Sequence, residues 1–215
     1  MTGKRSVMER KAAESPAHLI GGRLSVSFAN VPGQPGKAPT LALTWEELVD
    51  FLEAAQIITA NRARQLLTLT QNEPQAADGL LARAQSLRGA LRRIFGAIVR
   101  KDRLEEDWIR PVNAVLQITE GHDELVADGE GWRIEFIARE EGLEWLLAAI
   151  ARSGAELLTE GAESRIRKCA NPECGLFFYD ASRTHKRRWC SMALCGNRSK
   201  VAAFAKRLQT RKQDS

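Results

Sequence analysis

The feature that most constrains this chain is the placement of its four cysteines, which all lie within 27 residues of a 215-residue sequence. They form two pairs with the same internal spacing, Cys169-x4-Cys174 and Cys190-x4-Cys195, with fifteen residues between the pairs. Each pair can fold as a tight loop that aims two sulfurs at one point, and the segment between the pairs returns the chain. The spacing therefore predicts a tetrahedral thiolate site near the C-terminus.

The residues between and after the cysteines have the local preferences that such a site requires. Asn171-Pro172 favours a turn in the first loop, and the apolar stretch 176–179 (LFFY) predicts a short strand. Asp180 then opens a turn. Ser191 is a favourable N-cap for a terminal helix that continues to about residue 208, so the second pair would lie at a helix start. Loop, hairpin and helix in this order resemble a treble-clef finger.

One structural Zn²⁺ is the ligand that we rank first for this site. Four thiolates leave no open position on the ion, and a segment of about 50 residues is too small to be stable on a hydrophobic core alone. Disulfides remain an alternative that a reducing compartment disfavours, and an iron–sulfur cluster is one that the spacing does not match. His185 could replace one ligand, but a solvent-facing histidine inside the segment THKRR is the stronger interpretation.

Charge is divided unevenly along the chain. Residues 165–215 contain thirteen Lys and Arg against three acidic residues, whereas residues 1–164 contain 19 bases and 24 acids. Such asymmetry is typical of a basic module for a polyanion joined to an ordinary acidic domain. A solvated basic tail is the alternative that charge alone leaves open.

Periodic apolar residues predict five helices in the acidic part. Thr44-Trp-Glu-Glu47 has the spacing of a capping box and should begin the first, and the second covers 60–69. Two later helices are predicted over 108–119, with Pro111 near the first turn, and over about 141–158. The third helix has the clearest pattern, and we expect its stripe to lie in the core, because it is too short for a coiled-coil seam. The stripe consists of Leu80, Ala84, Leu87, Leu91, Ile94 and Ile98.

Alternation of apolar and polar residues predicts strands in two places. Residues 23–30 read as one strand, and the segment 125–136, with the turn Asp128-Gly-Glu-Gly131, reads as a hairpin. The predicted fold class is α+β: a mainly helical N-terminal domain with a small antiparallel hairpin, and a C-terminal treble-clef-like zinc finger. The predicted boundaries are a disordered tail at 1–17, the helical domain at 18–163 and the finger at 164–215.

The C-terminal residues resemble the CGNR zinc finger family, whose name stands here as Cys195-Gly196-Asn197-Arg198. The resemblance extends over residues 165 to about 208. Other positions that follow the family's pattern are Leu176-Phe177, Asp180, Ser182-Arg183, Arg187-Arg188-Trp189-Cys190-Ser191-Met192 and Lys200-Val201. The resemblance implies a DNA-binding transcription regulator.

In that family the finger normally follows a domain called ABATE, to which a role in stress-induced transcription regulation is attributed. Gly21-Gly22 and the following residues 24–30 resemble the opening strand of that domain. The family commonly has Asp at the position of Ser27 and Thr at that of Val31, so a polar site built from those residue types is not carried over. Our hypothesis for this domain is that it senses a small-molecule effector or forms a homodimer, and no ligand-binding residue is assigned.

Basic residues bracket the second cysteine pair, so a folded finger would hold them on a rigid frame as a surface for nucleic acid. Arg183 and Arg198 are the candidates for reading a guanine edge, although phosphate contact is the commoner role of arginine. We expect Trp189 to belong to the finger core rather than to stack on a base, and Asn197 to bond within the zinc loop. The nucleic-acid-binding candidates are Arg183, Lys186, Arg187, Arg188, Arg198 and Lys200.

The leading functional hypothesis is therefore a zinc-finger regulator that binds DNA. An RNA-binding or ribosome-associated protein and a protein-interaction adaptor remain alternatives, since zinc frames with basic rims serve both. We predict no enzyme and no catalytic residue, because His18, His122 and His185 are scattered and a closed tetrathiolate site admits no substrate. No apolar run reaches the roughly 20 residues of a membrane helix and no secretory signal is visible, so we expect a cytoplasmic protein without a membrane partner.

Overall fold

The computed structural model describes residues 19–31, 42–118, 121–128, 131–138 and 143–213. The tail predicted at 1–17 lies outside these residues. Helices, strands and short helical turns follow one another in this order: α2 (Leu24–Asn30), α3 (Trp45–Ala54), α4 (Ala60–Asn72), α5 (Pro74–Arg100), α6 (Glu106–Ile118), β1 (Gly121–Asp128), β2 (Gly131–Ala138), η2 (Glu144–Leu147), α7 (Ala148–Thr159), η3 (Ala162–Arg165), β3 (Ile166–Lys168), β4 (Phe177–Tyr179), η4 (Met192–Gly196) and α8 (Asn197–Gln213).

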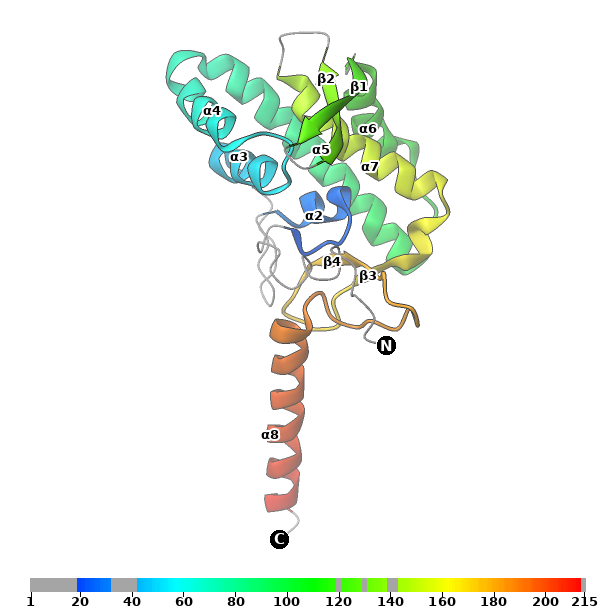
Figure 1. Cartoon of the computed structure of the whole chain (residues 1–215). Coiled ribbons are helices and arrows are strands. Elements are labelled where there is room, and N and C mark those ends of the chain that lie inside the picture. The colour runs from blue at the N-terminus through cyan, green and yellow to red at the C-terminus, as the bar shows by residue number, and fades with distance from the viewer. Residues whose placement is uncertain (1–18, 32–41, 119–120, 129–130, 139–142, 214–215) are drawn as a thin grey trace.

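Helix α5 runs through the middle of the helical body and contacts α2, α3, α4 and α6 (Figure 1). Its apolar stripe is buried in the main hydrophobic core as predicted, from Leu80 to Ile94, and Ile98 packs against the edge of that core. Phe28 and Phe51, from α2 and α3, meet there with ring centroids 5.2 Å apart. Among the described helices, none is long and apolar enough to span a membrane.

The helix starts follow local sequence signals. The Thr44 side chain accepts a hydrogen bond from the Glu47 N–H, and the Glu47 carboxylate accepts one from the Thr44 N–H, which confirms the predicted capping box. Thr59 caps α4 in the same way, by accepting from the Arg62 N–H. Pro74 occupies the first turn of α5, where a missing N–H costs no helical hydrogen bond.

The predicted hairpin is confirmed, because β1 and β2 pair antiparallel with Asp128 opposite Gly131. Two predicted helices begin elsewhere than expected. Helix α6 starts at Glu106, which puts Pro111 in its second turn rather than its first. The helix predicted from about 141 is a 3-10 turn over Glu144–Leu147, and α7 proper starts only at Ala148.

The strand predicted at residues 23–30 is wrong, because the segment is helix α2. Every residue from Ser25 to Asn30 is buried, so no exposed face distinguishes a period of 2 from one of 3.6. The polar side chains have partners instead of solvent: the hydroxyls of Ser25 and Ser153 are 3.1 Å apart, and Asn30 bonds to the backbone of Phe177. Ser27 and Val31, where the family has Asp and Thr, are both buried.

The short sheet that leads into the cysteine segment is packed into the helical body. Ile166 of β3 and Phe177 and Tyr179 of β4 are part of the main core. The Tyr179 N–H donates to the Gly21 carbonyl at 2.8 Å, next to the start of α2. A Cβ at Gly21 would lie 2.2 Å from the backbone nitrogen of Ser27, so only glycine fits this close to the backbone of α2. Helix α2 therefore lies between the helical body and the sheet (Figure 1).

Replacement of Asn30 by alanine should loosen this joint. The Asn30 amide donates to the Phe177 carbonyl at 2.7 Å and accepts from the Phe177 N–H at 2.8 Å, and both bonds are buried. Leaving two buried backbone groups without partners should lower the free energy of unfolding by about 2–4 kcal/mol. Urea unfolding measures this, with the exposed Asn113→Ala on α6 as the matched control. Equal stability of the two variants would contradict the role of Asn30.

Candidate metal centre

The first cysteine loop is held by its own backbone and by an asparagine. The Cys169 N–H donates to the Leu176 carbonyl at 2.9 Å, and the Cys174 N–H donates to the Asn171 carbonyl at 2.9 Å. The Asn171 carboxamide is buried; it accepts from the Glu173 N–H and donates to Cys195 Sγ at 3.7 Å. Asn171 thus shapes the first loop and joins it to the second cysteine pair.

The second loop places Cys190 and Cys195 at the start of the terminal helix. The Ser191 hydroxyl accepts from the Leu194 N–H at 3.3 Å, which confirms the predicted N-cap. The first turn, Met192–Gly196, is π-helical and carries Cys195, and α8 continues from Asn197. The Cys190 N–H also points at Cys169 Sγ, 3.5 Å away.

The four sulfurs converge on one point. All four cysteines are buried, and their sulfurs lie within 4.8 Å of one another. Two of the sulfur pairs, Cys174–Cys190 and Cys190–Cys195, are separated by 3.6 and 3.7 Å. A tetrahedral zinc site with Zn–S bonds near 2.3 Å requires sulfurs about 3.8 Å apart, whereas a disulfide requires about 2.05 Å. The donor set therefore fits a zinc ion and shows no disulfide geometry.

Burial makes a positive ion necessary for thiolates at this position. The hydrogen bond with Cys174 is the largest cause that raises the pKa of the Cys190 thiol, followed by burial and by repulsion from the other three cysteines. Burial is also the main cause that raises the pKa of Cys195. A divalent cation would lower the pKa of each thiol, because each thiolate would then face a positive charge instead of another sulfur.

A buried carboxylate, Asp180, organises the loop between the two cysteine pairs. One oxygen accepts from the Ser182 hydroxyl at 2.6 Å and from the Ser182 N–H at 3.0 Å, and the other accepts from the Arg187 N–H at 2.9 Å. Burial by itself would raise the pKa of Asp180, but these hydrogen bonds and the charge of His185 hold the pKa below its ordinary value. Asp180 therefore fixes both ends of the loop that carries the basic residues.

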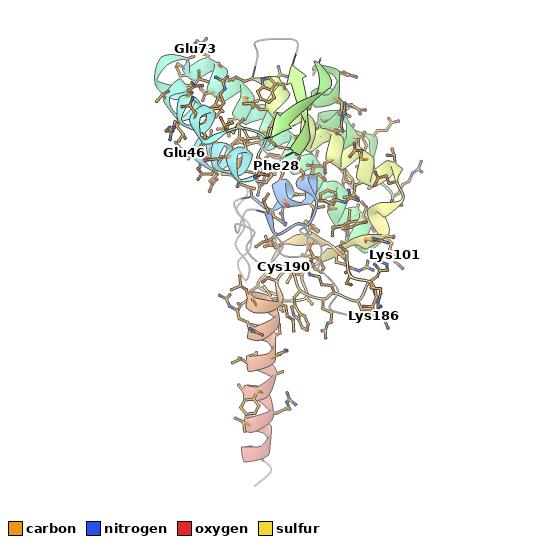
Figure 2. All side chains as sticks on the ribbon, viewed as in Figure 1. Phe28, Glu46, Glu73, Lys101, Lys186 and Cys190 are labelled. Atoms are coloured by element: carbon orange, nitrogen blue, oxygen red, sulfur yellow. The ribbon has the colours of Figure 1, made fainter. Side chains whose placement is uncertain are left out.

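The six predicted nucleic-acid-binding side chains are all exposed. Arg183, Lys186 and Arg188 lie on the Asp180 loop, and Figure 2 shows Lys186 at the outer edge of the finger that contains Cys190. Arg198 and Lys200 lie in the first turns of α8, on the other side of the second cysteine pair in sequence.

Arg187 differs from the other five. Its guanidinium donates to the carbonyls of Trp189 and Cys190 and lies over the Phe178 ring, 4.7 Å from the centroid. Arg187 therefore supports the metal loop, and two nitrogens of its guanidinium already donate within the finger.

The neighbouring side chains support the finger from inside. Trp189 packs against the cysteine cluster and donates through Nε1 to the Ser199 hydroxyl at 3.0 Å, as expected of a core residue. The Asn197 side chain donates to the Ala193 carbonyl within the zinc loop, as expected. His185 is exposed, has φ 49°, and lies outside the cysteine cluster.

Sequence reasoning assigned no role to Asn30, to the Asp180 carboxylate beyond its turn, or to Arg92. Arg92 donates through Nη1 to the Ala29 carbonyl at 2.8 Å and lies over the Phe177 ring, so it also joins the helical body to the finger. The only sequence signal was the short spacing from Asp180 to Ser182, which is typical of a side-chain-stabilised turn. The partners of Asn30 and Arg92 are distant in sequence and gave no signal.

The fold and the sulfur geometry define a zinc-finger protein in which a small thiolate-bound module is packed on a helical body. Comparison with family models agrees: the CGNR zinc finger matches residues 165–208, and the ABATE domain, described as "Putative stress-induced transcription regulator", matches residues 22–161. The second match covers more than half of the chain. The chain belongs to the ABATE family and carries a C-terminal CGNR zinc finger. No curated protein gives a significant match.

Asp180→Asn should weaken the finger while all four metal ligands remain. Loss of a buried charged acceptor with three bonds should lower the free energy of unfolding by about 2–3 kcal/mol, measured on the zinc-loaded protein. Because the folded-state pKa of Asp180 is lowered, its stabilisation is complete above the unfolded pKa of about 3.9 and is lost as the pH falls below it. The exposed Asp50→Asn is the control. A wild-type advantage that grows in acid would contradict this account.

Proposed function

We propose that this chain is a DNA-binding transcription regulator whose finger docks on duplex DNA through the basic residues around the second cysteine pair. The observation that carries the proposal is the placement of five exposed cations, other than Arg187, on a loop fixed by Asp180 and on a helix fixed by Cys195. A rigid frame reduces the conformational entropy that is lost when such side chains contact phosphates. The family description supports regulation as the context.

Helix α8 supports the same role. It contains six Lys and Arg and no acidic residue, and it projects from the finger away from the helical body (Figure 1). An α-helix fits the major groove of B-DNA, where arginine recognises guanine by two hydrogen bonds. We assign that reading role to Arg198, at the start of α8, and to Arg183; Lys186, Arg188 and Lys200 contact phosphates.

A second copy of the chain is the partner that we assign to the apolar side of α8. Among the described residues, the large hydrophobic side chains that are exposed all lie between 192 and 208, except Leu67. Leu194, Val201 and Leu208 repeat every seven residues, which places them on one side of the helix together with Phe204. Pairing of two such helices would present two fingers to two half-sites, as in dimeric regulators.

The other parts of the proposal concern the helical body and the compartment. We propose that the ABATE domain transmits an effector signal to the finger, and that binding rather than catalysis is the activity of the chain. Four unlinked, buried thiols are compatible with the reducing cytoplasm, where zinc rather than disulfide formation stabilises small modules. An RNA-binding protein and a protein-interaction adaptor are the alternatives that the DNA experiment below separates.

Native mass spectrometry of the purified chain should show one zinc ion per chain. A single tetrahedral cluster offers four ligands, and Cys174→Ser should abolish retention of zinc because the remaining three sulfurs leave the site open. Loss of zinc should also unfold the finger, seen as increased amide exchange in residues 165–200. Retention of iron, or of two ions per chain, would contradict a single structural zinc site.

Duplex DNA should bind with a steep dependence on salt. The triple variant Lys186→Gln, Arg188→Gln and Lys200→Gln should lower the magnitude of the slope of log K against log salt by about 2.7, which is about 0.9 for each lost phosphate contact. Fluorescence anisotropy with random and selected duplexes measures this, and zinc content checks the fold. The matched control removes three exposed arginines outside the finger: Arg64→Gln, Arg83→Gln and Arg103→Gln.

Three results of that experiment would count against DNA as the partner. Equal loss of affinity in the matched control would show non-specific charge binding. Tighter binding of structured RNA than of any selected duplex would favour the RNA alternative. Lack of binding to either nucleic acid would favour the adaptor. A two-fold symmetric sequence recovered by selection from a random pool would support pairing of two fingers.

A further inference from the structure

A groove of about 380 Å³ lies on helix α5, and none of its lining residues is a metal ligand or belongs to α8. Four arginines line it, and Trp108 of α6 contributes the aromatic side chain. Its volume is within the range of small-molecule sites, about 300–1,000 Å³. The lining residues are Gln85, Arg88, Gly89, Arg92, Arg93, Gly96, Arg100 and Trp108.

The positive charge of this groove is partly buried. The side chain of Arg88 is only 2% exposed, and Arg92 is half-buried beside it. Burial, and then repulsion from Arg92, lowers the pKa of Arg88 to about 10, while Glu47 opposes this shift. Two groups of like charge therefore lie on the same side of α5, and an anion in the groove would be attracted by both.

Two glycines lie between the arginines on the same face of α5. A Cβ at Gly96 would come within 3.2 Å of Arg100 Nη1, so glycine there lets the Arg100 guanidinium lie close to the helix backbone. Arg93 and Arg100 are exposed at the mouth, where Arg100 forms an ion pair with Asp102 at 2.6 Å.

We propose that this groove binds a small organic polyanion that carries phosphate groups. A guanidinium group can donate two parallel hydrogen bonds to the oxygens of one phosphate. Four guanidinium groups on one face offer more donors and more positive charge than one carboxylate can use. Arg88 and Arg92 contact the innermost phosphate, and Arg93 and Arg100 contact the outer one. Trp108 offers an indole ring to a planar apolar part of the ligand.

The groove is connected to the finger through Arg92. Its Nη1 donates to the Ala29 carbonyl at 2.8 Å, its Nη2 points at the Gly175 carbonyl at 3.5 Å, and its guanidinium lies 5.4 Å from the Phe177 ring centroid. Gly175 directly follows the metal ligand Cys174. An anion that draws Arg92 toward the groove would weaken its bonds to α2 and the first cysteine loop, so ligand and DNA affinities would be linked.

The link to DNA rests on the proposed function, whereas binding of the anion does not, so the two are measured separately. The zinc-loaded full chain is titrated calorimetrically with inorganic pyrophosphate and with adenosine 5′-diphosphate, in buffer near 0.1 M salt. Both probes should bind saturably, and adenosine should not. The double variant Arg93→Gln and Arg100→Gln should weaken both probes at least 10-fold; both residues are exposed, so the fold should persist.

Two matched variants test the location. Arg64→Gln with Arg83→Gln removes the same charge outside the groove, and the triple finger variant removes basic residues beside the metal; both should bind pyrophosphate as tightly as the wild type. Trp108→Phe should weaken adenosine 5′-diphosphate more than pyrophosphate. Citrate that binds as tightly as pyrophosphate would overturn the phosphate assignment. No saturable binding, or equal loss in the matched variants, would overturn the site.

The link to the finger is tested last. Saturating pyrophosphate should change DNA affinity at least 3-fold in the wild type and have no effect in Arg92→Lys, which keeps the charge but lacks the planar fork. If pyrophosphate binds but the chain binds no DNA, the groove stands and the proposed function fails. If Arg93→Gln and Arg100→Gln lower DNA affinity as much as the finger variant does, the groove is part of the DNA surface and the proposal is overturned.

Discussion

The convergence of four cysteine sulfurs is the constraint on which the C-terminal part of the structure depends. Sulfurs within 4.8 Å of one another, all buried, cannot carry negative charge together unless a cation lies among them. Two other side chains of the finger are attached to that point: Asn171 contacts Cys195, and Arg187 donates to the Cys190 carbonyl. A metal ion held by the four sulfurs would therefore act together with Asp180 to fix the loop that carries the basic residues.

Buried contacts and hydrogen bonds hold the finger against the helical body, although the two family models match them separately. Ile166 and Tyr179 flank the metal loops in sequence but are buried in the main core, and Asn30 supplies the hydrogen bonds that the Phe177 backbone would otherwise lack. A displacement of α2 would therefore shift β4, and with β4 the first cysteine loop. These contacts are the physical reason to connect the proposed effector site in the body with the proposed DNA affinity of the finger.

Local signals account for what the sequence predicted correctly. These signals lie between residues that are near one another in the sequence, so they can be recognised without knowing the fold. They are the Thr44 capping box, the apolar stripe of α5 and the equal spacing of the cysteine pairs. Helix α2 was mistaken for a strand because burial on all sides removes the periodic contrast on which such a prediction depends. The arginine groove was invisible for another reason: its residues follow helical spacing on α5, but Trp108 joins them only through the packing of α6.

The arginines of this chain lie in two different environments, and their degree of burial determines which kind of anion each group suits. The cations of the finger are exposed and fixed to a rigid loop, which suits a long polyanion that exchanges many weak, salt-sensitive contacts. Arg88 is buried and Arg92 half-buried, so each interaction with an anion is stronger there, and the groove has the volume of a small-molecule site. Net charge alone would assign both groups to nucleic acid. Their degree of burial is the reason to propose a DNA-binding surface for one group and an effector site for the other, with Arg92 as the residue that would connect the two.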